Sequence, residues 1–237
     1  MATESLSLPT PDGDMPAYQA RPDGEAVGGV LVVQEAFGLN DHIQSICRRL
    51  ADAGYLAVAP AFFHRSGGSP VFDYGDMESL RPVMMALTAE GIRADVETTL
   101  VHLASQGFSG TQVAVVGFCM GGSVALVAAV DHQLGAAVTF YGGGVSQGRF
   151  GFEPLAELAP HLATPWLGLF GDLDQGIPTD DVEALRAAAA TAPVETGVVR
   201  YPEAGHGFNC DQRESYHEPS ATDAWTRTLA WFGQHLH

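Results

Sequence analysis

The residue of this chain best placed to do chemistry is Cys119, which lies in the stretch 117–122, GFCMGG. A β-branched run at 113–116 precedes it and an apolar stretch from Ser123 follows, so the pattern predicts a strand, a tight turn and a helix. Glycines lack the Cβ atoms that would collide where the backbone reverses, so such a turn can hold a thiol at the end of a strand. Most buried cysteines are inert, but this setting favours a nucleophile.

Two backbone amides and one carboxylate are expected near that thiol. The N–H groups of Met120, directly after the cysteine, and of Ala36, in the loop after the first buried strand, are the natural donors of an oxyanion hole. Glu35 ends the same strand. From the residues alone, it either approaches the thiol or lies on the surface.

A thiol nucleophile needs a base, and the base needs an acid that fixes its tautomer. His206 stands out among nine histidines because it lies in a glycine-flanked loop after the last expected strand. Asp172 and Asp174 both follow the strand that ends at Phe170, and spacing does not choose between them. Nucleophile, acid and histidine in this chain order match the α/β-hydrolase arrangement.

The elements that must position these residues alternate along the chain. Residues 3–20 predict an edge hairpin that turns at 11–13, because Pro, Asp and Gly occur together there. Buried strands are expected at 28–33, 55–59, 113–118, 135–141, 166–170 and 196–201, and helices at 41–53, 77–87, 92–103, 123–130, 180–190 and 220–235. This order predicts one α/β domain over 1–237, with a mostly parallel twisted sheet, helices on both faces and polar loops at the strands' carboxyl ends. The loop at 62–70 could line a pocket or only cover the sheet.

The composition of the chain limits the kinds of binding partner that it can have. The chain has 237 residues and a net charge of −17, which argues against nucleic acid or an anionic membrane surface as the main partner. The start shows no signal-peptide pattern and no apolar run is long enough to span a bilayer, so a soluble, cytoplasmic protein is expected. Three cysteines without C-x-x-C spacing indicate neither a disulfide framework nor a metal site, and no cofactor-binding motif occurs. The sequence does not indicate an oligomeric state.

Four segments together carry a family resemblance. The sequences QEAFGLN at 34–40, GFCMGG at 117–122, GDLDQGIP at 171–178 and EAGHGF at 203–208 resemble, in order and spacing, the motifs of the dienelactone hydrolases (carboxymethylenebutenolidases). The resemblance implies an α/β-hydrolase fold with Cys119, Asp174 and His206 as the triad. It also implies that Glu35 interacts with Cys119 and helps to convert the thiol to thiolate when substrate binds.

The substrate pocket departs from the family pattern. Members that open dienelactone hold its carboxylate with arginines, one of them a few residues past the histidine, where this chain has Asn209-Cys210-Asp211. The nearest arginine there is Arg213, and Arg81 could supply another. The expected substrate-contacting residues are Arg81, Arg213, Phe37 and Tyr141.

These observations predict a hydrolase that opens a small-molecule lactone or cleaves an activated ester through an acyl-cysteine intermediate, without a cofactor. One alternative is a general carboxylesterase or thioesterase. Another is a hydrolase-fold protein that binds a small molecule without turning it over.

Overall fold

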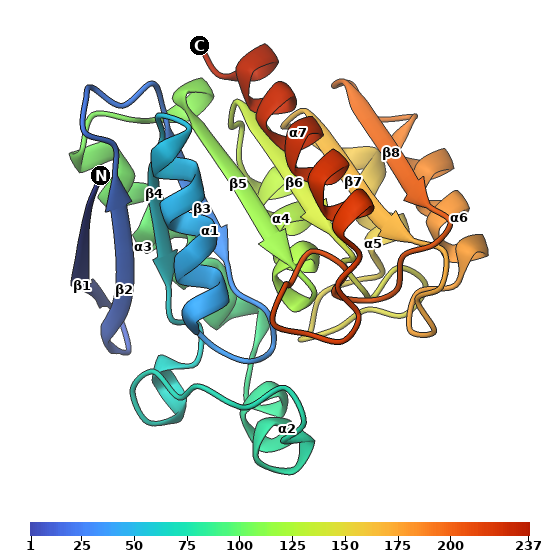
Figure 1. The fold of residues 1–237 in the computed structure, drawn as a ribbon, viewed down its shortest axis with the longest axis horizontal. Coiled ribbons are helices and arrows are strands. Elements are labelled where there is room, and N and C mark those ends of the chain that lie inside the picture. The colour runs from blue at the N-terminus through green and yellow to red at the C-terminus, as the bar shows by residue number, and fades with distance from the viewer.

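The computed structural model describes all residues 1–237, and its centre is an eight-stranded sheet in the order β1-β2-β4-β3-β5-β6-β7-β8 (Figure 1). The strands are β1 (Ala2–Thr10), β2 (Gly13–Arg21), β3 (Gly29–Val33), β4 (Leu56–Pro60), β5 (Val113–Phe118), β6 (Ala136–Phe140), β7 (Trp166–Gly171) and β8 (Thr196–Tyr201). The helices are α1 (Asp41–Asp52), α2 (Met77–Met85), α3 (Ala89–Ser105), α4 (Met120–Asp131), α5 (Leu155–Leu158), α6 (Thr179–Ala189) and α7 (Glu218–His235).

The sheet is antiparallel only at its first edge. β1 and β2 form the expected hairpin, with Thr10 paired to Gly13 across the turn, and β2 runs antiparallel to β4. Every pairing from β4 onward is parallel. The mostly parallel sheet with helices on both faces is the predicted α/β-hydrolase fold, so the fold prediction is confirmed.

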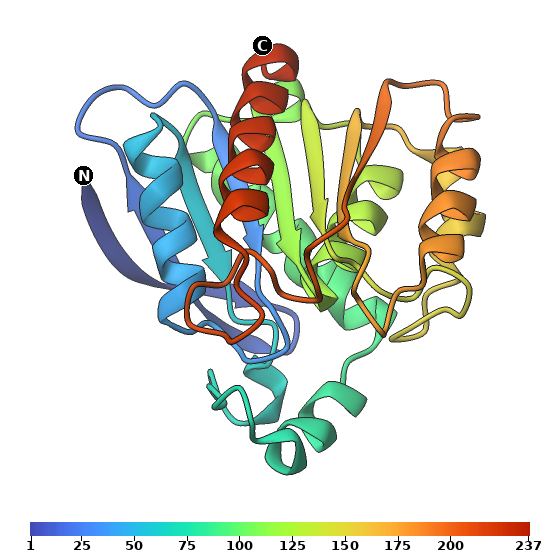
Figure 2. The same cartoon turned by 45° about the vertical axis from the view of Figure 1, so that its right-hand side comes forward.

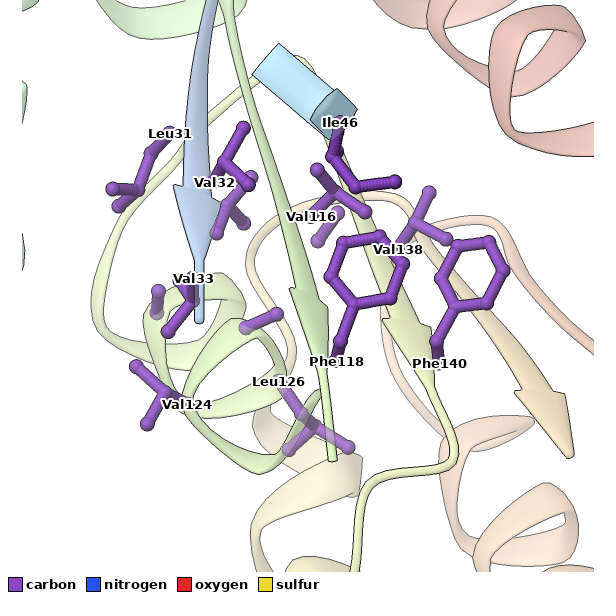
Figure 3. Packing of buried hydrophobic residues seen from close by; sticks show 14 of the residues in the cluster. Leu31, Val32, Val33, Ile46, Val116, Phe118, Val124, Leu126, Val138 and Phe140 are labelled. Atoms are coloured by element: carbon purple, nitrogen blue, oxygen red, sulfur yellow. The ribbon is translucent and has the colours of Figure 1, made fainter. Parts of the chain in front are cut away.

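Helices cover the two faces of the sheet unequally. α1 and α7 pack on one face, while α3 and α4 pack on the other, and α5 contacts both α4 and α6 (Figures 1 and 2). The continuous apolar runs of β3 and β5 are buried on both faces, as parallel strands require. In the core, Phe118 and Phe140 stack at 4.7 Å between their ring centroids, on neighbouring strands and beside Ile46 of α1 (Figure 3).

Several element boundaries differ from the sequence prediction by a few residues. α3 begins at Ala89 rather than at 92, because the side chain of Thr88 caps it by accepting from the N–H of Gly91. α2 ends at Met85, before the expected 87, and α7 begins at Glu218. Asn40 caps α1, with its side chain accepting from Ile43 N–H. No helix is both long and apolar enough to cross a membrane.

The carboxyl ends of the parallel strands converge at one edge of the sheet. The loops after β3, β5, β7 and β8 all reach this edge, and α2 stands beyond it on two connecting segments (Figures 1 and 2). Ligands of open α/β sheets bind at this edge, so the fold brings the four resemblance segments together where chemistry is expected.

Candidate active site

Cys119 sits between β5 and α4 in a backbone conformation that is strained for a residue with a side chain, with φ 56° and ψ −115°. Such strain is characteristic of a nucleophile held on a strand-to-helix turn. The glycines around it allow the turn: a Cβ on Gly117 would overlap the carbonyl oxygen of Gly121, and one on Gly121 would overlap that of Val33. The thiol is therefore presented at the sheet edge by backbone packing that tolerates no other residue type at these positions.

The structure brings Cys119, His206 and Asp174 into one hydrogen-bonded row. The Nε2 atom of His206 lies 3.1 Å from Cys119 Sγ, and its Nδ1 atom lies 2.6 Å from Asp174 Oδ2. Asp174 is buried, and its other oxygen accepts from the N–H of Gly176. This is the arrangement of nucleophile, base and orienting acid that activates a thiol.

The geometry separates the two aspartates that spacing left open. Asp172 forms a two-pronged ion pair with Arg200 on the neighbouring strand β8, with nitrogen–oxygen distances of 2.7 and 2.9 Å. It makes no hydrogen bond to His206, whose only carboxylate partner is Asp174. Asp172 therefore holds strands together, and Asp174 is the acid of the row.

The electrostatics of the row favour a protonated imidazole. Burial lowers the pKa of His206, but the hydrogen bonds and negative charges of Asp174 and Cys119 outweigh it and raise the pKa to about 10. The shift is the one expected where an imidazolium forms an ion pair with a thiolate. His206 can thus carry a proton at neutral pH.

Two backbone amides near Cys119 have no hydrogen-bond partner. The N–H groups of Met120, first residue of α4, and of Ala36, in the loop after β3, donate no hydrogen bond to the rest of the chain. Ala36 and Cys119 line the same cavity. The pair is a candidate oxyanion hole, to which the N-terminus of α4 would add its dipole.

Glu35 is fully buried, and its environment raises its pKa above the ordinary value because desolvation outweighs the charge of Arg213 and the hydrogen bond from Tyr141. The Tyr141 hydroxyl donates to Glu35 Oε1 at 3.1 Å, and Arg213 Nη1 lies 3.8 Å from the same oxygen. Glu35 Oε2 has no hydrogen-bond partner, and no hydrogen bond joins Glu35 to Cys119. The structure thus places Glu35 beneath the site, with the thiol directed to His206 instead.

An open cavity of about 1410 Å³ lies over the thiol. Of the residues expected to contact substrate, Arg81, Arg213 and Phe37 line it, together with Cys119 and His206. Helix α2 supplies much of its apolar wall through Met77, Leu80, Met84 and Met85. The loop at 62–70 does not line this cavity. Of the two predicted roles, lining a pocket or only covering the sheet, it therefore fits the second.

Tyr141 requires a correction. The sequence assigned it to the substrate, but its side chain is fully buried and does not line the cavity. Its hydroxyl is occupied by Glu35, and burial together with the Glu35 charge raises its pKa, so it remains a hydrogen-bond donor. Tyr141 therefore supports Glu35 rather than touching substrate.

The sequence analysis did not predict the other cavity residues of α2, and it also missed Arg149 and Phe150. These last two lie in the segment between β6 and α5, which has no periodic pattern. Phe150 has a positive φ of 57°, and the Arg149 guanidinium lies 5.4 Å from its ring centroid. The signal that could have found Arg149 is its isolation: it is the only basic residue between Arg93 and Arg186.

Comparison with known proteins identifies the family of the chain. The model of the dienelactone hydrolase family matches residues 15–236. A Yersinia pestis protein provisionally named a carboxymethylenebutenolidase is 40% identical over 97% of this chain and 87% of its own length.

Two solved structures extend the likeness to three dimensions. A crystal structure from Klebsiella pneumoniae, provisionally named a dienelactone hydrolase, superposes with a TM-score of 0.89 at 39% identity, covering 99% of each chain. A dienelactone hydrolase-like promiscuous phosphotriesterase from metagenomic libraries superposes with a TM-score of 0.80 at 25% identity, covering 100% of each chain. Family, relatives and fold agree: the chain belongs to the dienelactone hydrolase family and is a carboxylic ester hydrolase of the lactone or ester type.

Proposed function

We propose that this enzyme opens lactones or cleaves activated esters through an acyl-cysteine intermediate on Cys119. The observation that carries the proposal is the row of contacts in which His206 lies 3.1 Å from the Cys119 sulfur and 2.6 Å from the Asp174 carboxylate. A thiol, an imidazole and a buried carboxylate at these distances form a complete apparatus for acyl transfer.

The first half of the reaction acylates the enzyme. His206 holds the thiol proton, and the Cys119 thiolate attacks the carbonyl carbon while the amides of Ala36 and Met120 bind the developing oxyanion. As the tetrahedral intermediate collapses, the bond from carbon to the leaving oxygen breaks and His206 delivers its proton to that oxygen. In a lactone, the leaving oxygen stays attached to the acyl chain as its new hydroxyl group.

The second half releases the acid. His206, now neutral and oriented by Asp174, takes a proton from water, and the resulting hydroxide equivalent attacks the thioester carbon. The carbon–sulfur bond breaks, and the sulfur leaves as the thiolate. Because a thiolate is expelled more readily than a poor alkoxide or an amine, the first half favours substrates with good leaving groups. Enol lactones and thioesters meet this condition, and peptides do not.

Glu35 acts indirectly in this proposal. Burial raises the pKa of Glu35, and the carboxyl lies 3.8 Å from Nη1 of Arg213. Arg213 itself lines the cavity. A bound substrate that draws on Arg213 changes the charge balance at Glu35, which is how Glu35 takes part in the switch to thiolate that the family resemblance implies.

The cavity indicates the kind of substrate. Its wall on α2 combines several apolar side chains with Glu78 and Arg81, and neither Arg81 nor Arg149 forms an ion pair within the chain. We infer that the substrate is a lactone or ester with an apolar body and a carboxylate, which these arginines bind. Phe37, whose ring lies 5.5 Å from the Arg213 guanidinium, forms part of the wall beside Cys119.

The decisive comparison sets cis- and trans-dienelactone against a panel of p-nitrophenyl esters and thioesters. Higher kcat/KM on the lactones supports a lactone hydrolase, and faster turnover of the simple esters favours the general carboxylesterase. Should neither class be turned over, iodoacetamide labelling of Cys119 separates the remaining options. Stoichiometric labelling already at neutral pH indicates an active nucleophile with another substrate, and an unreactive thiol indicates a protein that only binds its ligand.

A further inference from the structure

A second cluster of reactive side chains lies apart from the row around Cys119. His42 comes from the first turn of α1, and Cys210 and Asp211 come from the loop that follows His206. One possible ligand atom from each of these three residues lies within 4.8 Å of the others. Imidazole, thiolate and carboxylate are the three side-chain types that bind Zn²⁺ in proteins.

Two of the three residues in the cluster are buried. His42 is 2% exposed and Cys210 is 0% exposed, whereas the Asp211 side chain is 71% exposed and opens toward solvent. A small cavity of about 200 Å³ is lined by His42, Asp211 and Asn209, among other residues. The cavity therefore reaches His42 and Asp211, and the buried sulfur of Cys210 lies within 4.8 Å of their possible ligand atoms.

Buried polar atoms without partners mark the same place. The Nε2 atom of His42 has no hydrogen-bond partner, and neither polar atom of the Asn209 side chain has one, although Asn209 is only 3% exposed. Buried polar groups are normally hydrogen-bonded, so unpartnered ones that line a cavity point to a ligand which completes them.

The surroundings prepare the ligands for a metal. Asn40 Nδ2 donates to the Tyr74 hydroxyl oxygen at 3.1 Å, so the Tyr74 proton is directed to Cys210 Sγ at 3.2 Å or to Gln212 Oε1 at 3.4 Å. A hydrogen-bond partner behind a ligating sulfur orients it toward the metal.

Charges around the cluster oppose one another. Asp211 lies 3.9 Å from His42 Nδ1, and its charge acts against those of Arg49 and Arg213, which also influence His42. The Arg49 guanidinium stacks over the Trp225 ring at 3.8 Å. A divalent cation that displaces the Cys210 proton adds only one net positive charge to this group.

We propose that His42, Cys210 and Asp211 bind a Zn²⁺ ion, with water as a fourth ligand. Binding replaces the Cys210 S–H bond by a zinc–sulfur bond and releases one proton to solvent, without any change in oxidation state. Because Cys210 and Asp211 lie between His206 and Arg213 in the chain, the ion ties to α1 the loop that carries both.

The test uses the Cys119→Ala protein, which removes the other thiol able to bind zinc beside a histidine. Titration with Co²⁺ is expected to give one equivalent of binding with a thiolate-to-cobalt charge-transfer band, and Zn²⁺ should displace the cobalt and raise Tm. The band should disappear in Cys119→Ala/Cys210→Ser and persist in Cys119→Ala/Cys47→Ala, in which a buried cysteine of α1 is changed instead.

A further variant keeps the test valid if Cys210→Ser does not fold. Asp211 is exposed, so Cys119→Ala/Asp211→Asn should fold normally and bind Co²⁺ at least about tenfold more weakly. The proposal is overturned if the Cys119→Ala protein shows no thiolate band. It is also overturned if Asp211→Asn leaves the affinity unchanged, or if the band survives Cys210→Ser.

Discussion

The Nε2 atom of His206 lies 3.1 Å from the sulfur of Cys119. The other ring nitrogen, Nδ1, lies 2.6 Å from Asp174 Oδ2. Glu35, by contrast, is bound to the Tyr141 hydroxyl and has no hydrogen bond to the thiol. The structure thus joins the thiol to the imidazole, while the buried carboxylate of Glu35 contacts Tyr141 instead. The proposed roles of these residues lead to four predictions.

The first prediction concerns the orienting acid. Asp174→Asn keeps the side-chain shape but lets the amide donate toward His206, which favours the wrong tautomer. We expect kcat/KM on a p-nitrophenyl ester to fall by about 10²-fold or more. Asp172→Asn is the matched control, because Asp172 pairs with Arg200 at the sheet edge and not with His206. Equal losses in the two variants would contradict the assignment of Asp174.

The second prediction concerns the turn that holds Cys119. A Cβ on Gly121 would overlap the carbonyl oxygen of Val33, a backbone atom of β3 that has no freedom to move. Gly121→Ala should lower the free energy of unfolding by about 3 kcal/mol or prevent folding. Gly233→Ala in α7, where a Cβ meets nothing within 4 Å, should instead raise stability by about 0.5–1 kcal/mol. Urea unfolding of the two variants measures both effects, and a harmless Gly121→Ala would refute the packing argument.

The third prediction concerns the charge on Glu35. Its folded-state pKa is raised by burial, so its contribution to stability is fully present below the unfolded pKa and is lost as pH rises through the folded one. Glu35→Gln keeps an oxygen that can accept from Tyr141 but carries no charge. Relative to the wild type, we expect Glu35→Gln to gain on the order of 1 kcal/mol in unfolding free energy between pH 5 and pH 8. If Glu35→Gln instead loses unfolding free energy relative to the wild type as pH rises, the charge of Arg213 dominates over desolvation at this carboxyl.

The fourth prediction concerns the arginines of the cavity. Arg81 and Arg149 line it without an ion pair, so they are expected to bind a carboxylate distant from the reacting carbonyl. The probe is the p-nitrophenyl ester of adipic acid with its second carboxylate free, compared with the same compound capped as a methyl ester. The double variant Arg81→Gln/Arg149→Gln should reduce the preference for the free acid by about tenfold, mainly through KM.

The control for this substitution is Arg227→Gln, which removes an exposed arginine paired with Asp223 on α7. The preference for the free acid should be unaffected in it. If the double variant keeps the wild-type preference, the two cavity arginines do not recognise the substrate's charge.

Much of the fold could be predicted from the sequence because its strands are fully buried. Runs such as 29–33 and 113–118 have no polar face, which is typical of parallel strands covered on both sides, and the helices between them have capping residues such as Asn40. Exact ends were less predictable, since a cap such as Thr88 competes with the apolar pattern.

The candidate site was predictable where its residues follow strands in short glycine-rich loops. The choice of Asp174 over Asp172 needed the family resemblance, and the structure shows the physical reason in the pairing of Asp172 with Arg200. Whether Tyr141 faces substrate or Glu35 depends on a positive φ of 38° at the end of β6, which spacing does not encode.

The zinc-binding cluster lay outside sequence reasoning altogether. His42 is far from Cys210 and Asp211 in the chain, so no ligand spacing marks the site, and the absence of C-x-x-C spacing led the sequence reading to expect no metal. Only the docking of the loop after His206 against α1 brings the three side chains together.

The most direct test of the central claim is the mass of the enzyme during turnover. His206→Gln removes the base that activates water, so an activated ester should acylate Cys119 slowly and the acyl-enzyme should accumulate. Intact-protein mass spectrometry is expected to show the mass of one acyl group on His206→Gln, and peptide mapping should place it on Cys119. The same ester should leave Cys119→Ala/His206→Gln unmodified. Ester turnover that survives in Cys119→Ala, or an adduct mapped to another residue, would contradict the acyl-cysteine mechanism.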